Sequence, residues 1–402
     1  VTPALHYKPM KITSRCFVFF FLCLLATFPA IPQTPSQKFL VFVGTYTDKT
    51  DSKGIYAYEF DASTGKLTPR GLAAETSNPS WVVIHPNGKW AYAANESGKQ
   101  STISAFSIDA KSAKLTLLNK LPALGDDPCY LSFDKTGKYL FVANYTSGNV
   151  VVVPILPDGK LGAATANVKD QGTLGPNKER QEAPHAHWVG ARGNEVFVAD
   201  LGLDRVLLYG FDPTKGTLRK APGPDAKHPF FSSDLKLSPG TGPRHVAFSS
   251  TEKGHGLTYV LGELDSTVSL FATTIEGNYA GLPGQKITAL PIGFSGRNDA
   301  AEIYIHQNGK LLYASNRGHD SIAVFAIDPK LGTLTQVADV STGGKEPRHF
   351  AIDPTGQVLL AENQNSNSIV VFRINTETGA LSQISMTEGV PSPVCLTFLR
   401  IP

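Results

Sequence analysis

A pattern of about fifty residues repeats along the chain, and it restricts the fold more than any other feature of the sequence. The segment 79–95 (PSWVVIHPNGKWAYAAN) reappears as 128–144 (PCYLSFDKTGKYLFVAN), and each runs sixteen positions from its proline to its asparagine. A further copy begins at Pro243 and is stretched by an insertion around residues 251–256, so that Gly262 takes the asparagine position. The same sixteen positions separate three more pairs: Pro184 and Asp200, Ala300 and Asn316, Pro347 and Asn363.

Each copy predicts four short strands. Two apolar runs lie inside the repeated segment, a β-branched or aromatic run follows it, and a Gly-Lys-Leu or Gly-Thr-Leu turn leads into a fourth run. The third runs are residues 102–108, 150–155, 206–211, 268–273, 322–327 and 369–374. No segment shows a sustained 3.6-residue apolar period, so helix is expected to be minor. The chain is therefore predicted to be all-β, a β-propeller with four antiparallel strands in each blade.

The two ends of the repeat array predict the number of blades. Residues 393–398 have the pattern of a first strand, and no second strand follows them. Residues 40–44 match a second strand, with Gly44 in the asparagine position, and no first strand precedes them. We expect the two fragments to complete one blade, which gives seven blades in a ring closed by pairing the C-terminal strand with the N-terminal blade. Such closure leaves no open sheet edge at that point.

Residues 1–33 have the pattern of a secretory signal peptide. Lys8, Lys11 and Arg15 precede an apolar run over residues 16–28, which is too short for a comfortable membrane span. We expect this segment to export the protein to the periplasm or the extracellular space, with an uncleaved anchor as the alternative. Residues 34–402 are then expected to form a single propeller domain.

The composition limits the partners of that domain. The formal net charge is +3, and the three basic residues of the signal segment account for the excess, so the remainder is near neutral. It holds no basic run of the kind that binds nucleic acid, and we expect a monomer or a dimer without a nucleic-acid or membrane partner. Cys129 and Cys395 fall two blades apart, beyond the roughly 7 Å between Cα atoms that a disulfide spans, so both are predicted to be free thiols.

Aligning the copies brings unlike side chains to two equivalent positions at one mouth of the central channel. Several guanidiniums there suit a carboxylate or phosphate ligand, and a nearby histidine can act as a general base. The position after the lead proline holds Ser80, Cys129, His185, Arg244, Ala301, Arg348 and Val394. The position after the polar end of the second strand holds Thr45, Glu96, Tyr145, Leu201, Glu263, Arg317 and Gln364.

Structural roles are alternatives for several of these residues. Arg244 and Arg348 could bond carbonyls of neighbouring blades, and His187, aligned with apolar residues of other blades, could be a core histidine. The asparagines at the strand ends are most simply turn caps, with a metal site as the alternative. The sequence contains no Gly-x-Ser-x-Gly, His-Glu-x-x-His, Walker or Cys-x-x-Cys motif, which disfavours covalent serine or cysteine catalysis.

Five motifs in order carry a family resemblance: PHAH at 184–187, GPRH at 242–245, GEL at 262–264, SNRGHDS at 315–321 and EPRH at 346–349. With VGTYT at 43–47 and RQE at 180–182, the chain resembles, over about residues 39–400, the lactonase family of seven-bladed propellers. That family includes the propeller-type 6-phosphogluconolactonases and the carboxymuconate cyclases. The resemblance implies a catalytic set of one histidine, two arginines and one glutamate, which falls on His185, Arg244, Glu263 and Arg317.

The resemblance implies hydrolysis of a sugar lactone to its aldonic acid, without a metal or other cofactor. His185 or Glu263 would deprotonate the attacking water, and Arg244 and Arg317 would stabilise the oxyanion and hold an acidic group of the substrate. We also expect substrate contacts from His187, His245, His319, Arg348 and Gln364. A signal peptide conflicts with a cytosolic phosphorylated substrate, so the lactone stays open. The alternatives are a non-enzymatic exported propeller scaffold and a metal-dependent gluconolactonase.

Overall fold

The computed structural model describes residues 1–4, 37–221, 234–252, 254, 256–273 and 284–401. Nearly all of the predicted signal peptide lies outside the described residues, so its role stays a prediction. The described residues from Gln37 onward form one compact unit. No helix in the described part of the chain has the length and apolar character needed to span a bilayer.

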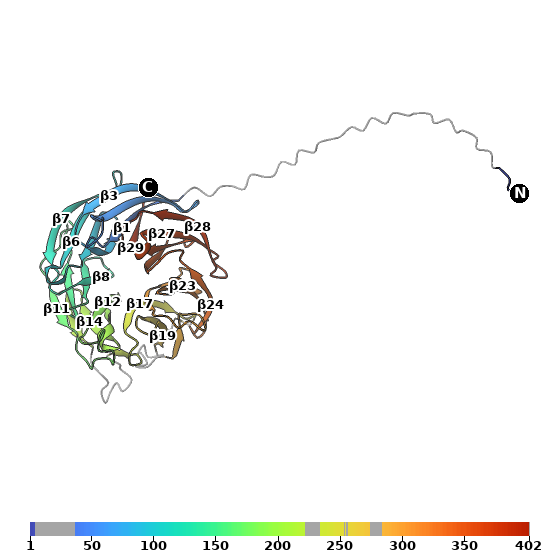
Figure 1. Cartoon of the computed structure of the whole chain (residues 1–402). Helices are drawn as coiled ribbons and strands as arrows, with labels where there is room; N and C mark the ends of the chain where they lie inside the picture. Colours follow the sequence, from blue (N-terminus) through green and yellow to red (C-terminus); the bar gives the residue numbers. More distant parts are fainter. Residues whose placement is uncertain (5–36, 222–233, 253, 255, 274–283, 402) are drawn as a thin grey trace. The chain divides into compact units, whose positions relative to one another are not determined.

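Seven antiparallel sheets, counted within the described residues, succeed one another around a ring (Figure 1). Each sheet is one blade, and its strands are given from the channel outwards. The first blade consists of β29 (Pro393–Arg400), β1 (Lys38–Thr45), β2 (Gly54–Asp61) and β3 (Lys66–Glu75). The second consists of β4 (Pro79–Ile84), β5 (Trp90–Asn95), β6 (Thr102–Asp109) and β7 (Lys114–Pro122), and the third of β8 (Pro128–Phe133), β9 (Tyr139–Asn144), β10 (Asn149–Pro154) and β11 (Ala166–Lys169).

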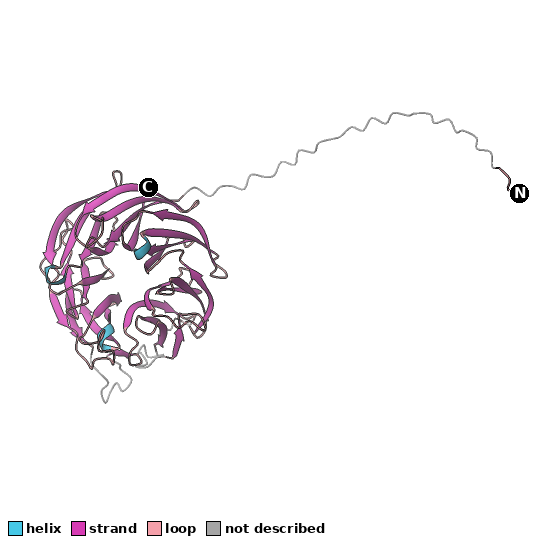
Figure 2. Cartoon of the chain, viewed as in Figure 1, coloured by secondary structure: helices cyan, strands magenta, loops and turns pink. Residues whose placement is uncertain are grey.

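The fourth blade holds β12 (Ala186–Arg192), β13 (Glu195–Asp200), β14 (Arg205–Asp212) and β15 (Thr217–Lys220), with β16 (Asp234–Lys236) added to β14. The fifth blade consists of β17 (Pro243–Ser250), β18 (Gly256–Gly262), β19 (Thr267–Ala272) and β20 (Gln285–Thr288). The sixth consists of β21 (Asp299–Ile305), β22 (Leu311–Arg317), β23 (Ser321–Ile327) and β24 (Leu334–Ser341), and the seventh of β25 (Pro347–Ile352), β26 (Val358–Asn363), β27 (Ser368–Ile374) and β28 (Leu381–Glu388). Helix in the described residues is confined to three short 3₁₀ turns, Gly98–Gln100, Leu201–Leu203 and Gln364–Ser366 (Figure 2).

The ring closes as predicted, because β29 is the inner strand of the blade that also contains β1 to β3. One detail of the prediction is wrong. Thr45 pairs with Pro393 across a bulge, whereas Gly44 pairs with Cys395. Thr45 therefore takes the place that Asn144 holds opposite Pro128, and Tyr46 follows it at the mouth.

The predicted register is also wrong in the fourth blade. Asp200 pairs with Ala186, not with Pro184, and Arg192 pairs with Glu195 across a short hairpin. In the second and third blades the corresponding hairpins are longer, and Pro79 and Pro128 pair with the asparagines sixteen positions on. Counting sixteen positions back from Asp200 therefore overshoots by two residues. His187, not His185, is the equivalent of the residue after the lead proline.

The hydrophobic core lies between adjacent blades, so the middle strands are buried on both faces. β18 is buried along its whole length, whereas the outer strand β28 is largely exposed. Tyr92, Tyr259 and Tyr313 occupy the same place in three second strands and are fully buried. Their hydroxyls donate to the carbonyls of turn glycines in the next blade, Gly159, Gly332 and Gly379, at 2.9, 2.7 and 3.3 Å. The φ angles of these glycines, 73–85°, explain why glycine recurs in this turn.

Candidate active site

A bulge near the start of the inner strands turns one side chain of each toward the mouth of the channel. In β4, β8, β12, β17 and β25 the pairing shifts between the first and third residues, which leaves the second residue in the bulge. Bulges re-aim side chains and recur at functional sites. The bulge residues are Ser80, Cys129, His187, Arg244 and Arg348, and all but Ser80 line one pocket.

That pocket has a volume of about 330 Å³, and we call it the charged pocket. The second source of its side chains is the position after the polar residue near the end of each second strand, which supplies Tyr46, Glu96, Tyr145, Glu263 and Arg317; the last of these still belongs to β22. Loops and the first residue of β21, Asp299, add the rest. Its lining residues are Tyr46, Glu96, Cys129, Tyr145, Arg180, His187, Arg244, Glu263, Arg297, Asp299, Arg317, Glu346 and Arg348.

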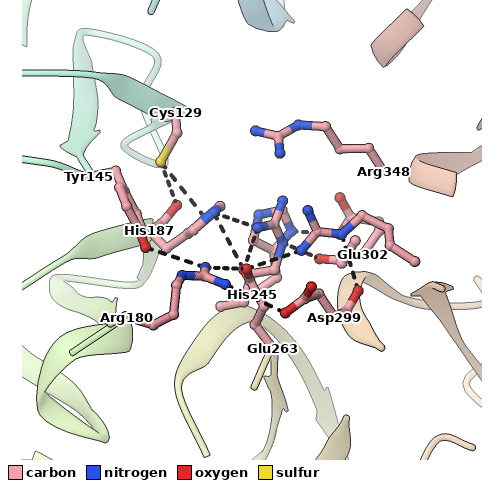
Figure 3. Close-up of polar contacts among 12 residues, drawn as sticks. Cys129, Tyr145, Arg180, His187, His245, Glu263, Asp299, Glu302 and Arg348 are labelled. Atoms are coloured by element: carbon pink, nitrogen blue, oxygen red, sulfur yellow. Dashed lines mark hydrogen bonds and ion pairs between the residues drawn. The ribbon is translucent and has the colours of Figure 1, made fainter. Parts of the chain in front are cut away.

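The Glu263 carboxylate lies at the centre of the charged pocket and is only 2% exposed (Figure 3). Its Oε2 accepts from Arg244 Nη1 at 2.5 Å, and its Oε1 accepts from Arg180 Nη2 at 2.6 Å. Arg317 Nη2 lies 3.1 Å from the same Oε1. Burial alone would raise the pKa of Glu263, but the surrounding guanidiniums, Arg244 first, hold it well below its usual range. Glu263 is therefore ionised and fixes the arginines in place.

Arg244 joins Glu263 to His187. Its Nη1 donates to His187 Nε2 at 2.7 Å, and its Nε donates to the Ala301 carbonyl of the next blade at 2.8 Å. The bond to Ala301 is the contact that the structural alternative predicts, so Arg244 supports the ring as well as lining the pocket. Burial of the ring and the adjacent Arg244 charge lower the pKa of His187 well below its ordinary value. His187 is thus a neutral imidazole at pH 7.

Arg317 and Arg348 offer donors that the protein leaves unused. Arg317 Nε donates to the Asp299 carbonyl at 3.1 Å, whereas its buried Nη2 makes the ion pair with Glu263 Oε1 but no hydrogen bond among the described residues. Burial and the charge of Arg244 lower the pKa of Arg317 to about 10, so it stays charged at neutral pH. Arg348 stands over the Tyr46 ring at 5.2 Å and lies 4.0 Å from Glu96 Oε2, apart from the Glu263 cluster (Figure 3).

His185 lies behind the charged pocket and does not line it. Its ring stacks on Tyr145 with centroids 4.5 Å apart and planes 12° apart. Nδ1 is 3.0 Å from the Tyr145 carbonyl and Nε2 is 3.1 Å from Glu182 Oε1, so both ring nitrogens have partners. The sequence predicts His185 at the mouth because it places the register of the fourth blade two residues too early, and His187 takes that position instead.

The other predicted substrate contacts are divided between sites. His187 and Arg348 line the charged pocket. His245 is bonded through Nδ1 to Glu302 Oε1 at 3.0 Å and does not line it. His319 is held by Ser321 Oγ at 2.8 Å beside Phe294, and Gln364 borders a neighbouring polar pocket that shares Tyr46 and Glu96.

The pocket also contains residues that the alignment of repeats misses. Arg180 comes from the loop before β12, and it pairs with Asp299 at 3.5 Å as well as with Glu263. No repeat copy matches that loop, although the RQE segment at 180–182 is part of the family resemblance. The alignment also misses Tyr46, because it places Gly44 instead of Thr45 at the end of the second strand and so assigns the pocket position to Thr45.

Two alternatives for the polar residues can be assessed. Burial raises the pKa of the Cys129 thiol, so this pocket residue is not a thiolate at neutral pH. The strand-end asparagines cap turns, since Asn144, Asn316 and Asn363 donate to the carbonyls of Ala123, Ala289 and Thr342. Among the described residues, no group of three or more His, Cys, Asp or Glu side chains is arranged to hold a metal ion.

Comparison with known proteins agrees with this architecture. Residues 40–398 match the family described as lactonase, 7-bladed beta-propeller. The chain belongs to this lactonase family. A 6-phosphogluconolactonase of Bacillus subtilis (strain 168) is 37% identical over 366 residues, which cover 90% of this lactonase and 99% of the relative.

Solved structures give the same result. A putative 6-phosphogluconolactonase from Bacteroides fragilis is 35% identical, with a TM-score of 0.80, and covers 92% of this chain and 99% of its own. A periplasmic gluconolactonase of Pseudomonas aeruginosa is 32% identical, with a TM-score of 0.81, and covers 91% and 100%. This lactonase is accordingly a hydrolase that acts on lactones, and the comparisons give no support to the scaffold alternative.

Proposed function

We propose that the protein opens a sugar lactone bearing an anionic group, and that the reaction takes place in the charged pocket. The observation that carries the proposal is the unused donor capacity of Arg317 and Arg348 beside the Glu263 cluster. The Arg317 guanidinium is held by the Asp299 carbonyl and by Glu263, but its buried Nη2 makes no hydrogen bond among the described residues. An oxyanion, carboxylate or phosphate would supply that acceptor. The pocket, at about 330 Å³, has room for one sugar ring.

The reaction needs a base, an oxyanion contact and a proton for the leaving oxygen. His187, neutral and inside the pocket, takes a proton from water as the water oxygen bonds to the lactone carbonyl carbon. Arg317 stabilises the oxygen that becomes negative. When the ring C–O bond breaks, the ring oxygen takes up the proton held by His187, and the product is a hydroxy acid.

Glu263 and Arg244 have positioning roles in this proposal. Because the pKa of Glu263 is held well below its usual range, its carboxylate is a weak base. It orients Arg317 instead, while Arg244 donates to His187 Nε2 and must yield that nitrogen to the incoming water. Arg348, from the opposite wall, is assigned to the anionic group of the substrate.

The predicted signal peptide and two of the relatives bear on the substrate. One relative is named for a phosphorylated gluconolactone and another is a periplasmic gluconolactonase. We propose that this protein is exported and meets its lactone outside the cytoplasm. The anionic group is then a phosphate or a carboxylate on the sugar.

A panel of lactones tests the proposal. Glucono-δ-lactone, its 6-phosphate and glucaro-1,4-lactone, which keeps a free carboxylate, would be compared by acid release in a pH-stat, each corrected for spontaneous opening. We expect the highest kcat/KM for an anionic lactone, and a KM that rises for that lactone alone in Arg348→Ala. Equal kcat/KM for charged and neutral lactones would refute the anionic class, and activity lost with chelator would favour a metal-dependent mechanism.

A further inference from the structure

The central channel holds a second cavity, which we call the aromatic cavity. Its volume is about 470 Å³ and its walls include Trp81, Tyr130, Trp188, Tyr304, Glu302 and His349. The inner strands begin at the charged mouth, and the lining residues of β17, β21, β25 and β29 come from positions further along these strands. No described residue lines both pockets.

Side chains of the inner strands separate the two sites. The residue after each bulge points into the channel, and these rings meet across it. Trp81 lies 5.6 Å from His245 and 5.2 Å from His349, and Tyr130 lies 5.1 Å from His245, each measured between ring centroids in edge-to-face contact. This layer closes the channel between the charged pocket and the aromatic cavity.

Small residues leave the space beyond the layer open. Two residues after the layer, the inner strands carry Ala247, Ala351 and Thr397, which all line the cavity. The equivalent residue of β12 is Gly190, where a Cβ would lie 2.3 Å from Trp188 Cη2. Trp188 therefore lies along its own strand only because Gly190 has no side chain. The cavity therefore exists because the inner strands carry small side chains two residues after the layer.

The cavity wall contains one buried polar atom that has no hydrogen-bond partner among the described residues, Glu302 Oε2. Glu302 Oε1 accepts from Ile303 N at 2.9 Å and is bonded to His245, but Oε2 is buried and has no hydrogen-bond partner among the described residues. The Glu302 side chain is 9% exposed. His349 Nε2 lies 3.6 Å from that Oε2, while Nδ1 is engaged by Glu362 Oε2 at 2.6 Å. An acceptor and a ring nitrogen thus stand side by side as an ion pair, 3.6 Å apart, too far for a direct hydrogen bond.

The charges of this pair favour a neutral hydroxyl over a cation. The histidines hold the pKa of Glu302 below its usual value although burial opposes this, so its oxygen is an acceptor. Glu362 and Glu302 raise the pKa of His349 although burial opposes this, so Nε2 tends to carry a proton. A hydroxyl can donate to the first and accept from the second, whereas an ammonium group would be repelled by His349.

We propose that the aromatic cavity binds the ring of a neutral sugar, with one hydroxyl bridging Glu302 Oε2 and His349 Nε2. Aromatic walls with a few converging polar groups are the usual make-up of a small-molecule site. The C–H faces of a sugar ring pack on the electron-rich faces of Trp and Tyr side chains. This inference does not rest on the proposed lactone substrate, because the two pockets share no described lining residue.

Calorimetric titration with methyl β-D-glucopyranoside tests the site, since this probe has no lactone carbonyl. We expect saturable binding by the wild type and none by Ala351→Phe, which fills the cavity from a partly exposed position. Glu302→Gln removes the charged acceptor, and its affinity should fall by about 10–100-fold. Thr116→Phe, which introduces the same phenyl ring at an exposed position of the outer strand β7, should bind as the wild type does. Ala351→Phe should keep the lactonase activity.

Thr397→Phe fills the cavity from another strand, so the result does not depend on one variant folding. The proposal is overturned by a wild type that does not bind the glycoside, or by glycoside binding that persists in both filled variants. It is also overturned if tetramethylammonium binds in place of the glycoside, because a cation would need Glu302 alone. If Glu302→Gln does not fold, the two filled variants decide the question.

Discussion

The two halves of the central channel are built by the same inner strands, yet their chemistry differs. Consecutive residues serve opposite halves: Arg244 lines the charged pocket, whereas the next residue, His245, belongs to the layer that closes the channel. Arg348 and His349 divide in the same way. The bulge between them causes this division, because it turns the first side chain to the mouth and the second across the channel. The same bulge, repeated in several inner strands, thus separates the charged pocket from the aromatic cavity.

The halves also differ in what stabilises them. The charged pocket contains buried ion pairs, and removing one partner of such a pair commonly costs about 3–5 kcal/mol because the other charge is left unpaired. The closing layer consists of edge-to-face rings around the Glu302 carboxylate. We therefore expect substitutions in the charged pocket to change activity, whereas loss of the strand that both halves share should change stability.

The largest effect should come from removing the strand that both halves need. Deletion of residues 391–402 takes away β29 and leaves the inner edge of β1 unpaired. We expect aggregation and loss of cooperative unfolding, measured by size-exclusion chromatography and thermal melting. Deletion of residues 401–402 alone is the control and should melt normally. A truncated protein that melts like the full chain would show that closure by β29 is wrong.

The second effect concerns the charged pocket alone. Arg317→Ala removes the proposed oxyanion contact, and turnover should fall by about 10²–10³-fold, as for other oxyanion donors. The melting temperature should change much less than turnover, because Glu263 keeps Arg244 and Arg180 as partners when Arg317 is removed. His319→Ala is the matched control, two residues on and outside the pocket. Near-full turnover in Arg317→Ala at unchanged stability would place the chemistry elsewhere.

Variants of His185 and His187 distinguish the observed register of the fourth blade from the predicted register. His187→Ala should lower turnover by about 10²-fold or more if His187 is the general base. His185→Ala should keep most of the turnover but lower the melting temperature, since the ring stacks on Tyr145 and both nitrogens are bonded. The opposite pattern in the two variants would restore His185 as the catalytic histidine.

The dependence of turnover on pH should reflect the surroundings of His187 and Arg317 in the charged pocket. Burial and Arg244 lower the pKa of His187 well below 6.5, so the neutral base persists as pH falls through 6.5. Turnover should therefore decline only in more acidic buffer, where His187 becomes protonated. It should also decline as pH rises through about 10, where Arg317 loses its charge. An acidic limb at pH 6.5 in kcat/KM would indicate an unperturbed histidine as the base.

The smallest effect concerns Cys129. Burial raises the pKa of its thiol, and neither Cys129 nor Cys395 forms a disulfide. Iodoacetamide should leave turnover of the native protein unchanged although Cys129 lines the charged pocket. In protein lacking residues 1–33, two thiols should titrate after denaturation without reductant. Rapid loss of activity on alkylation would mean that the thiol is accessible and reactive.

The strand framework is predictable because every blade solves the same packing problem with the same pattern. The apolar runs, the glycine turns and the sixteen-residue spacing all recur, and the structure confirms the seven blades and their closure. The prediction fails where one blade departs from the pattern without a change in composition. A hairpin shorter by two residues in the fourth blade moves His187 into the place predicted for His185.

The charged pocket is predictable only where repeats supply its residues. Arg244, Glu263 and Arg317 occupy repeated positions, and the structure brings them together. Arg180 comes from a loop with no counterpart in other blades, so only its tertiary contacts with Glu263 and Asp299 reveal it. The aromatic cavity depends on the absence of side-chain volume at Gly190, Ala247 and Ala351, which carries no motif.

The shared blade has a consequence for the synthesis of the protein. Six blades can form as their own contiguous segments emerge, but the blade of β1 lacks its inner strand until β29 is made. A chain interrupted during translation therefore displays an unpaired strand edge, the feature that promotes aggregation and engages chaperones. Closure of the ring thus distinguishes a chain that contains β29 from every product that ends before it.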